Sequence, residues 1–424
     1  MKIEKHIEKE KEGTYLTVPF EVPENVRKIT ISYDYPHKTK GIVGNIRPGN
    51  IIDLGVFDPT GRFIGWSGSS KDKISIGEYG SERGYFSQKT MSGKWKIAVG
   101  AYRVRPGGVN VTYNIDFTPN TPEWLYGDLH IHSDASDGRF DPFEIGRRAK
   151  RRGLDFVAVA NHNNCTDNFS PPVLEDMTFL PAVEWTHYKG HMNFFGVCAP
   201  FEKTFVANTA EEKRKIVSNA REQGAVISVN HPECPFCPYL WEDDDYDMIE
   251  IWNGPMRGAN IRAIKLWTEK LRGGRRLPAV GGSDFHKPGL FVKIGKPVTA
   301  VYSESRSAHD ILEALASGRS FVTCSAKGPR IIAGAKRLYS GREKRLQKNT
   351  VVKIKASQMR GERLTAVTDR GETPIPRCSK KEFETEIVLP GDVAFCYIKA
   401  VRNFFGLNVI RAVTNPVYFN KEEK

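Results

Sequence analysis

The sequence predicts an α/β protein in which a central domain of alternating strands and helices lies between two β-rich domains. Residues 1–121 hold short β-type runs that are separated by turn sequences such as DPTG and RPGG. Residues 122–328 alternate apolar runs with helical patterns, and residues 329–424 return to β-type runs. At 424 residues the chain exceeds what one hydrophobic core usually organises, which agrees with a division into domains at these boundaries.

The N-terminal domain is expected to be a β-sandwich. Its strand candidates are VRKITISYDY, NIIDLGVFDPTGRFIGWS, KWKIAVGAYRV and GVNVTYNIDFTP. A spacing near ten residues, with turns that contain glycine and proline, is typical of that fold. The segment PNTPEW, residues 119–124, is interpreted as a linker.

The central domain repeats a strand–helix pattern. Its strand candidates are short, nearly continuous apolar runs of the kind found in parallel sheets: LDFVAVAN, GAVISVNHP, DMIEIWNG, LPAVGGSDFH and KPVTAVYSES. Two helices are marked by their ends. Asp141 caps a helix with Pro142 at its first position, and a second helix runs between the cap Thr209 and the stop signal Gly224. Repeated units of this kind imply an α/β barrel or an open parallel sheet.

The C-terminal domain is predicted from the β-type runs VVKIKAS, RLTAVTD, ETEIVLPGDVAFCYIKAV and NPVYF. It is also the most basic part of the chain. The whole chain has a net charge of +13, and residues 330–424 hold 20 Lys and Arg against 10 Asp and Glu. This excess suits an anionic partner such as nucleic acid, but no repeated aromatic–basic module accompanies it, so a solvated basic face is favoured.

Cellular location is predicted from three absences in the sequence. No run of roughly 18 apolar residues is present that would span a membrane. The charged N-terminus lacks the apolar region of a secretory signal, and the seven cysteines are scattered rather than paired in a pattern. We therefore expect reduced thiols and a cytoplasmic protein with no membrane partner. The sequence does not indicate an oligomeric state.

Histidines and carboxylates recur where the predicted central strands end. In GDLHIHSDASDG, residues 127–138, His130 and His132 are two residues apart on a strand and therefore face the same side. Asp284 and His286 form a second pair of this kind in GGSDFH. The other candidates at strand ends and in the first loop are Asp137, His162, Glu184, His191 and His231. In an α/β barrel the carboxyl ends of the strands converge on one site.

These residues together indicate a metal site, although a single histidine at a strand end is more often a hydrogen-bonded structural residue. Six of the ten histidines and three carboxylates would share one pocket, and such a cluster is costly to desolvate without a cation. Zinc, manganese and iron all accept imidazole and carboxylate ligands. Nine ligands exceed the need of one ion, so we expect two or three divalent metal ions (Zn, Mn or Fe).

The motifs resemble those of a known family. GDLHIHSDASDG, ANHNN, PAVEW followed by GHMNFFG, VNHPE and GGSDFH, spread over residues 125–290, are similar to the motifs of the polymerase-and-histidinol-phosphatase (PHP) superfamily of metal-dependent phosphoesterases. The flanking β domains and the closing TNPVYF resemble the branch of carbaryl-hydrolase-like metallohydrolases. The resemblance implies a distorted (β/α)7 barrel with a trinuclear site. The ligands that it implies are His130, His132, Asp137, His162, Glu184, His191, His231, Asp284 and His286.

The resemblance also implies roles for these residues. Glu184 is the expected bridging carboxylate, and the residues expected to carry catalysis are His130, His132, Glu184, His231 and Asp284. Asp134 competes with Asp137 for the ligand position in the first loop. The chain departs from the family pattern at Asn161, where the family usually has an aspartate that could orient the neighbouring histidine; asparagine still accepts a hydrogen bond, but without charge.

The expected chemistry is hydrolysis. A water between two cations loses a proton near neutral pH and becomes the nucleophile, and the same ions stabilise the charge that grows on the substrate. We predict a phosphoesterase that uses a hydroxide bridging two or three metal ions on a small phosphate ester or a nucleotide. A hydrolase of a carbamate, ester or amide at the same site is the alternative, and a nucleic-acid-binding or non-catalytic module is less favoured.

Five further features near the motifs are candidates for a place in or beside the substrate pocket. Lys189, Arg257 and Lys287 would hold an anionic substrate, although each alone is more often a surface charge. His187 is either a leaving-group acid or a loop residue. CPFC, residues 234–237, is interpreted as a rigid pocket wall rather than a zinc site, because the chain has no second CxxC.

Overall fold

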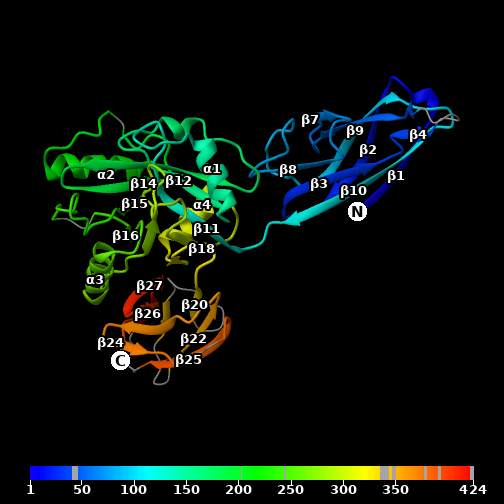
Figure 1. Cartoon of the computed structure of the whole chain (residues 1–424). Coiled ribbons are helices and arrows are strands. Elements are labelled where there is room, and N and C mark those ends of the chain that lie inside the picture. Colours follow the sequence, from blue (N-terminus) through cyan, green and yellow to red (C-terminus); the bar gives the residue numbers. More distant parts are fainter. Residues whose placement is uncertain are drawn as a thin grey trace. The chain divides into compact units, whose positions relative to one another are not determined.

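The computed structural model describes residues 1–40, 46–201, 203–242, 245–334, 343–345, 350–376, 380–389 and 393–420 (Figure 1). It is a mixed α/β structure with many strands and few helices. The chain divides into two compact units, which we call the N-terminal unit (Met1–Thr121 with Val173–Asp176) and the C-terminal unit (Pro122–Pro172 with Met177–Lys424). The predicted domain boundaries stay predictions.

The N-terminal unit contains two four-stranded antiparallel sheets. The first has the order β1 (Lys2–Ile7), β10 (Val109–Pro119), β3 (Val26–Asp34) and β8 (Lys73–Gly77). The second has the order β2 (Tyr15–Val22), β9 (Gly93–Arg103), β6 (Ile51–Phe57) and β7 (Phe63–Gly68). Alternating apolar side chains of both sheets, such as Ile31 and Ile97, pack into one buried core, as in a β-sandwich. A short 3-10 helix, η1 (Lys9–Lys11), and the pair β4 (Lys38–Lys40) and β5 (Ile46–Pro48) complete the unit.

The C-terminal unit is organised by one long mixed sheet. Seven of its strands carry the candidate site: β11 (Glu123–Ile131), β12 (Phe156–Val159), β13 (Thr178–His187), β14 (Gly190–Phe195), β15 (Val226–Val229), β16 (Met248–Asn253) and β17 (Ala279–Gly282). They lie in the order β17-β16-β15-β14-β13-β12-β11, and β18 (Val298–Ser303) and β19 (Ser320–Thr323) follow. Among the seven strands most pairs are parallel, but β14 is antiparallel to both of its neighbours.

The two ends of the seven-strand set meet. Residues Ile131 and Phe285 form a parallel bridge, and the Asp284 N–H donates to the His130 carbonyl at 2.8 Å. Gly282 permits this approach, because a Cβ at that position would lie 2.4 Å from the Cβ of His130. The polar residues that follow β11 and β17 are therefore side by side.

The described residues of this unit include four α-helices: α1 (Pro142–Arg151), α2 (Ala210–Glu222), α3 (Gly258–Arg272) and α4 (Ala308–Ala316). Two predicted helix starts are confirmed. The Asp141 side chain accepts from the Glu144 N–H, and Thr209 forms a reciprocal capping box with Glu212. One further turn, the 3-10 helix η2 (Thr166–Phe169), follows β12.

The strands after β19 extend the same hydrogen-bonded sheet. The pairing of β19 with β27 (Leu407–Thr414) leads on to β26 (Phe395–Phe404), β23 (Arg363–Thr368) and β24 (Gly371–Pro374). A separate sheet contains β20 (Arg330–Gly334), β22 (Thr350–Ser357) and β25 (Phe383–Leu389). The remaining strands are β21 (Glu343–Arg345) and β28 (Val417–Asn420).

Two sequence interpretations are wrong in detail. KPVTAVYSES contains β18, which is antiparallel to both β11 and β19 rather than parallel. A strand that is buried on both faces is nearly all apolar in either orientation, so the pattern could not distinguish them. PNTPEW is not a free linker along its whole length, because Glu123 and Trp124 already pair with Ser303 and Tyr302.

Two predictions that bear on cellular location can be compared with the described part of the chain. None of its helices combines the length and the apolar character that a membrane span requires. Six cysteines there are free thiols, and Cys378 lies outside the described residues.

Candidate metal centre

The nine predicted ligands converge at one end of the seven-strand set. His130 lies on β11 and His132 directly follows it, while Glu184 and His191 lie on the neighbouring strands β13 and β14. His162 pairs with Glu184 in an isolated bridge just after β12. His231 follows β15, and Asp284 and His286 follow β17. The site is therefore assembled from neighbouring strands of the sheet that together span residues 123–282.

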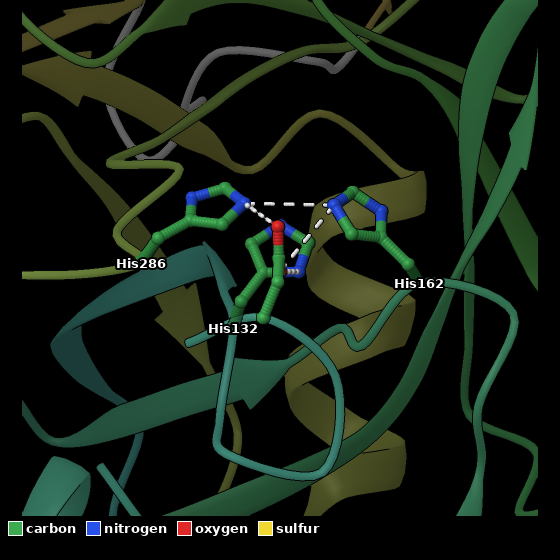
Figure 2. Close-up of side chains that lie close together, drawn as sticks. His132, His162 and His286 are labelled. Atoms are coloured by element: carbon green, nitrogen blue, oxygen red, sulfur yellow. Dashed lines mark hydrogen bonds and ion pairs between the residues drawn. The ribbon is translucent and has the colours of Figure 1, made fainter. Parts of the chain in front are cut away.

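Four of these residues form what we call the outer cluster: His132, Asp137, His162 and His286. One ligand atom of each lies within 4.8 Å of those of the others. The three imidazole rings are turned toward one another, and His286 Nε2 lies 3.5 Å from His162 Nε2 (Figure 2). The Asp137 carboxylate lies close to two of these rings: its Oδ1 is 3.6 Å from His162 Nε2, and its Oδ2 is 3.4 Å from His286 Nε2. Its carboxylate, rather than that of Asp134, is the one placed in the cluster.

A second group, the inner cluster, consists of His130, His231, Glu250 and Asp284. His130 is shared by two sets of ligand atoms, one with His231 and Glu250 and one with His132 and Asp284. The His130 and Glu250 side chains are 0% and 3% exposed, whereas the Asp137 side chain of the outer cluster is 56% exposed. The two clusters thus offer the same ligand types in different surroundings.

Glu184 lies between the clusters. Its Oε1 is 3.2 Å from His130 Nε2 and 3.4 Å from His231 Nε2 on the inner side. Its Oε2 is 2.8 Å from His162 Nδ1 and 3.6 Å from His132 Nε2 on the outer side. One carboxylate therefore presents one oxygen to each cluster, which is the geometry that a bridging ligand requires.

The donor set fits a cation. Three buried side-chain atoms at the centre make no hydrogen bond of acceptable geometry, although ionisable neighbours lie close to each of them: His130 Nε2, His132 Nδ1 and Glu184 Oε2. Leaving such atoms without hydrogen bonds in a dry interior is expensive, and divalent ions held by the two clusters would provide partners for them. His130 is also oriented for this role, because its Nδ1 lies 3.2 Å from Glu250 Oε1. A proton held there leaves the Nε2 lone pair facing Glu184 and Asp284.

Electrostatics support the same interpretation. Burial opposes ionisation of Glu184, yet His130 and the other histidines beside it hold the pKa of its carboxyl well below the usual range. Burial likewise opposes ionisation of Asp284, and His130, His132 and His231 nevertheless lower its pKa. Burial lowers the pKa of His130, but Asp284, Glu184 and Glu250 together raise it well above its ordinary value. The carboxylates and the imidazole of His130 thus stabilise one another's charged forms, and a divalent cation would provide the positive charge in place of a proton.

Two candidate ligands have strained backbones. His231 has φ of 27° and Asp284 has φ of 50°, a left-handed region that residues other than glycine rarely occupy. Each lies two residues after the end of a strand, and its side chain belongs to the inner cluster. Strain of this kind persists only where surrounding contacts determine the conformation, and it is frequent at functional sites.

The predicted substrate residues do not converge in the same way. Lys189 lies in the turn between β13 and β14, with its ammonium group 5.0 Å from the centre of the Trp241 ring. Arg257 caps α3 and donates to Asn253 Oδ1 at 3.2 Å, and Asn253 in turn donates to Asp284. Lys287 is exposed next to His286. Their role as a clamp stays a prediction.

A cavity of about 570 Å³ adjoins the site at His191 and Cys237. Its wall is largely apolar and includes Phe205, Val206 and Phe236. His187 also lines it, but both ring nitrogens are engaged: Nδ1 accepts from the Lys189 N–H at 3.0 Å, and Nε2 lies 2.9 Å from the Ala207 carbonyl. This pairing fixes the neutral ring with its proton on Nε2, which favours the structural role of His187 over that of a leaving-group acid.

Several residues that position the site were not identified from the sequence. Glu250 is the one charged residue in the apolar run MIEIWN, a signal that was available. Asp128 is fully buried and accepts from the N–H groups of Ser283 and Gly295 at 2.8 and 2.7 Å. Burial raises the pKa of Asp128 to about 6. These two hydrogen bonds of Asp128 connect β11 to the segment after β17.

The loop that carries Asp137 is held by hydrogen bonds of the Asn161 side chain. Asn161 accepts from the Ser133 N–H at 2.8 Å and donates to Asp167 at 2.8 Å. It also contacts Ser136, next to Asp137. Its hydrogen bonds therefore shape this loop and reach none of the histidines, contrary to the orienting role that the sequence suggested.

CPFC forms part of the cavity wall, as predicted, through Phe236 and Cys237. Cys237 also lies close to two candidate ligands. Its Sγ is 3.6 Å from His231 Nδ1, and it groups with His191 and His231 as a third set of potential ligand atoms. Sequence spacing alone gave no indication of this neighbourhood, because the contact arises from the fold of the loop after β15.

Comparison with known proteins gives distant similarities. No family model matches the chain. An uncharacterized protein of Methanocaldococcus jannaschii is 26% identical over 159 residues, which cover 34% of this chain and 90% of that protein. Among solved structures, a two-domain protein from Bacteroides vulgatus that contains a predicted PHP-like metal-dependent phosphoesterase has a TM-score of 0.42 and 17% identity, and covers 70% of this chain and 96% of that one.

An amidohydrolase from Chromobacterium violaceum with bound sulfate and no metal is a further structural neighbour. It has a TM-score of 0.25 and 16% identity, and the match covers 39% of this chain and 89% of that one. These similarities are too weak to identify the reaction, and the function proposed below rests on the residues of this chain.

Proposed function

We propose that the protein is a metal-dependent hydrolase of the PHP superfamily, and that it cleaves a small phosphate ester or a nucleotide. The observation that supports this most directly is that three buried atoms, His130 Nε2, His132 Nδ1 and Glu184 Oε2, make no hydrogen bond although they belong to the two clusters of ligand side chains and to the carboxylate between them. The central strands are proposed to form a distorted (β/α)7 barrel, for which the meeting of β17 and β11 is the supporting contact.

Two or three ions of zinc, manganese or iron would be held by the residues of the outer and inner clusters, with Glu184 between them and His191 beside the inner one. When bound, such ions activate water and stabilise the negative charge that develops on the ester. Glu250 keeps His130 in the tautomer that directs its Nε2 inward. Asp128 and Gly282 hold β11 and the segment after β17 at the separation that the inner cluster requires.

A carbamate, ester or amide hydrolase is the second candidate, and the cavity beside His191 favours it. The lining that the structure describes contains no lysine or arginine, and it includes the apolar side chains of Phe205, Val206 and Phe236. A neutral aromatic or acyl group fits such a wall better than a second phosphate would. A phosphoesterase with an apolar leaving group would use the same wall.

A side-by-side turnover assay separates the candidates. Protein loaded with manganese is given an aryl phosphate and an aryl carbamate, with His130→Ala as the inactive blank and His6→Ala, an exposed histidine of β1, as the matched control. Faster phosphate release, absent in His130→Ala and retained in His6→Ala, is the expected result. Carbamate turnover without phosphate turnover would assign the second function, and equal rates for His130→Ala and the unmodified protein would remove the site from both reactions.

A further inference from the structure

The outer face of the β2-β9-β6-β7 sheet carries an exposed group of aromatic side chains in the N-terminal unit. A surface pocket of about 790 Å³ is lined there by Tyr15, Phe57, Phe63 and Trp66, with Thr17 and Ala98 between them. Tyr15 is 80% exposed and Phe63 is 45% exposed. Large aromatic side chains in such exposed positions contribute nothing to the core on the other side of the sheet.

Two glycines in the strands beneath this group leave space for the indole ring of Trp66. Across the sheet, Thr17 pairs with Ala98, Ala98 with Gly55, and Gly55 with Trp66. A Cβ on Gly55 would lie 2.4 Å from the Trp66 ring, and a Cβ on Gly100 would lie 3.0 Å from its far edge. The indole therefore lies flat on two glycines in strand interiors, where glycine is otherwise unfavourable. Its outer face is left partly open.

The neighbouring groups extend this surface and give it a polar edge. Tyr15 meets Trp66 edge to face, with ring centres 5.9 Å apart, and Phe57 and Phe63 form a second pair at 5.5 Å. A Cβ on Gly100 would also lie 3.1 Å from an Asp53 carboxylate oxygen, so this carboxylate stands beside the indole edge. We call Tyr15, Asp53, Phe57, Phe63 and Trp66 the aromatic platform.

We propose that the aromatic platform binds a neutral sugar ring of an oligosaccharide or polysaccharide, a binding function separate from the metal centre. One face of a pyranose presents C–H groups that pack on an open indole, and its hydroxyl groups donate to a carboxylate at the edge. The pairing of a flat apolar plate with one hydrogen-bond acceptor matches that amphipathic ligand.

Other ligand classes fit the platform less well. A quaternary ammonium group needs rings that stand around it, and here Tyr15 and Trp66 are in contact with each other and leave no space between them. A nucleotide could stack on Trp66, but its phosphates would be repelled by Asp53. A polymer of neutral sugars is also extended enough to use the Phe57–Phe63 pair beside the indole.

The test is native gel electrophoresis of the full chain through gels that contain hydroxyethylcellulose, xylan, galactomannan or polygalacturonate. We expect at least one neutral polysaccharide to retard the protein, and the acidic polygalacturonate to retard it less. Tyr15→Ala and Asp53→Asn should each weaken binding of the effective polysaccharide by about two- to tenfold. Phe405→Ala, which removes a fully exposed aromatic ring of the C-terminal unit, should leave it unchanged.

Trp66→Ala should abolish retardation, and Tyr15→Ala protects the test against a folding defect because that side chain is largely exposed. Retardation that is equal in Tyr15→Ala, Asp53→Asn and the unmodified protein would overturn the proposal. The absence of any retardation would also overturn it. In that case, fluorescence quenching by tetramethylammonium would identify a cation site, and self-association in sedimentation that Tyr15→Ala removes would identify a second copy of the chain as the partner. Hydrolase activity plays no part in this readout, so the two proposals can fail independently.

Discussion

The inner and outer clusters use the same residue types but differ in how the fold holds them. In the inner cluster, His130 lies on a central strand, is fully buried and is oriented by Glu250. In the outer cluster, Asp137 lies in an exposed loop that is shaped by Asn161. Because the buried inner residues are held more closely by their surroundings than the exposed Asp137, they lose less conformational freedom when an ion binds. We therefore predict that an ion in the inner cluster would be held more tightly than an ion in the outer cluster.

The largest effect is expected at Glu184, whose carboxylate lies between the two clusters. Glu184→Gln removes the charge but keeps the shape, so both clusters lose their common anion. Turnover should fall by about a thousandfold or more, because the charge stabilisation supplied by metal ions is worth several kcal/mol. Metal analysis and the aryl phosphate assay measure this change.

Glu233→Gln is the matched control, since Glu233 pairs with Arg262 on the surface. If Glu184→Gln bound as much metal as this control, Glu184 would not bridge the clusters.

The next effect concerns the support of the inner cluster. Asp128→Ala leaves the N–H groups of Ser283 and Gly295 without their acceptor in a buried position. The free energy of unfolding should fall by about 2–3 kcal/mol, as measured by denaturant titration. The exposed Asp134→Ala should change it by less than about 0.5 kcal/mol. An equal stability of the two variants would contradict the anchoring role of Asp128.

A smaller effect is expected from the support of the outer loop. Asn161→Asp restores the residue that the family pattern usually has. In this chain, however, Asn161 Nδ2 donates to the Asp167 carboxylate at 2.8 Å, so the substitution places a second carboxylate beside that of Asp167. Repulsion between the two should displace the loop of Asp137 and weaken binding of the outer ion by about tenfold. Titration of the metal-free protein with manganese measures this.

Asn110→Ala, in an exposed position of the N-terminal unit, is the control for this titration. Tighter metal binding by Asn161→Asp would show that the loop is held by something other than the Asn161–Asp167 contact.

The smallest effect is expected from the three basic residues proposed from the sequence. Lys189, Arg257 and Lys287 are not among the residues that line the cavity beside His191. Replacing each with alanine should change KM for the aryl phosphate by less than about threefold, the range of an exposed charge. A rise of tenfold or more for any one of them would identify it as a substrate contact after all.

The sequence predicted the ligand types better than their surroundings. Pairs two residues apart on a strand, such as His130 and His132, necessarily face one side, and their position at strand ends indicated a common site. Glu250 and Cys237 reach the site through the packing of other strands and a loop, which short-range spacing does not reveal. The antiparallel direction of β18 was missed because burial on both faces removes the alternation that distinguishes strand types.

The role of Asn161 could not be predicted from the sequence either. Its partner Asp167 lies in the 3-10 helix η2, and only the fold brings the two side chains and Ser133 together. The aromatic platform was missed for a similar reason, since Tyr15 and Trp66 belong to strands that are separated by two others in the sheet.

The most direct test of the metal centre is the metal content of the purified chain under graded chelation. Protein prepared with manganese, iron or zinc is dialysed against increasing EDTA, and the ions that remain per chain are counted by mass spectrometry. We predict two or three ions per chain with at least one of the metals, and loss in two steps, of which Asn161→Asp shifts the first alone. No more than one ion per chain with any of the three metals would contradict the two-cluster centre.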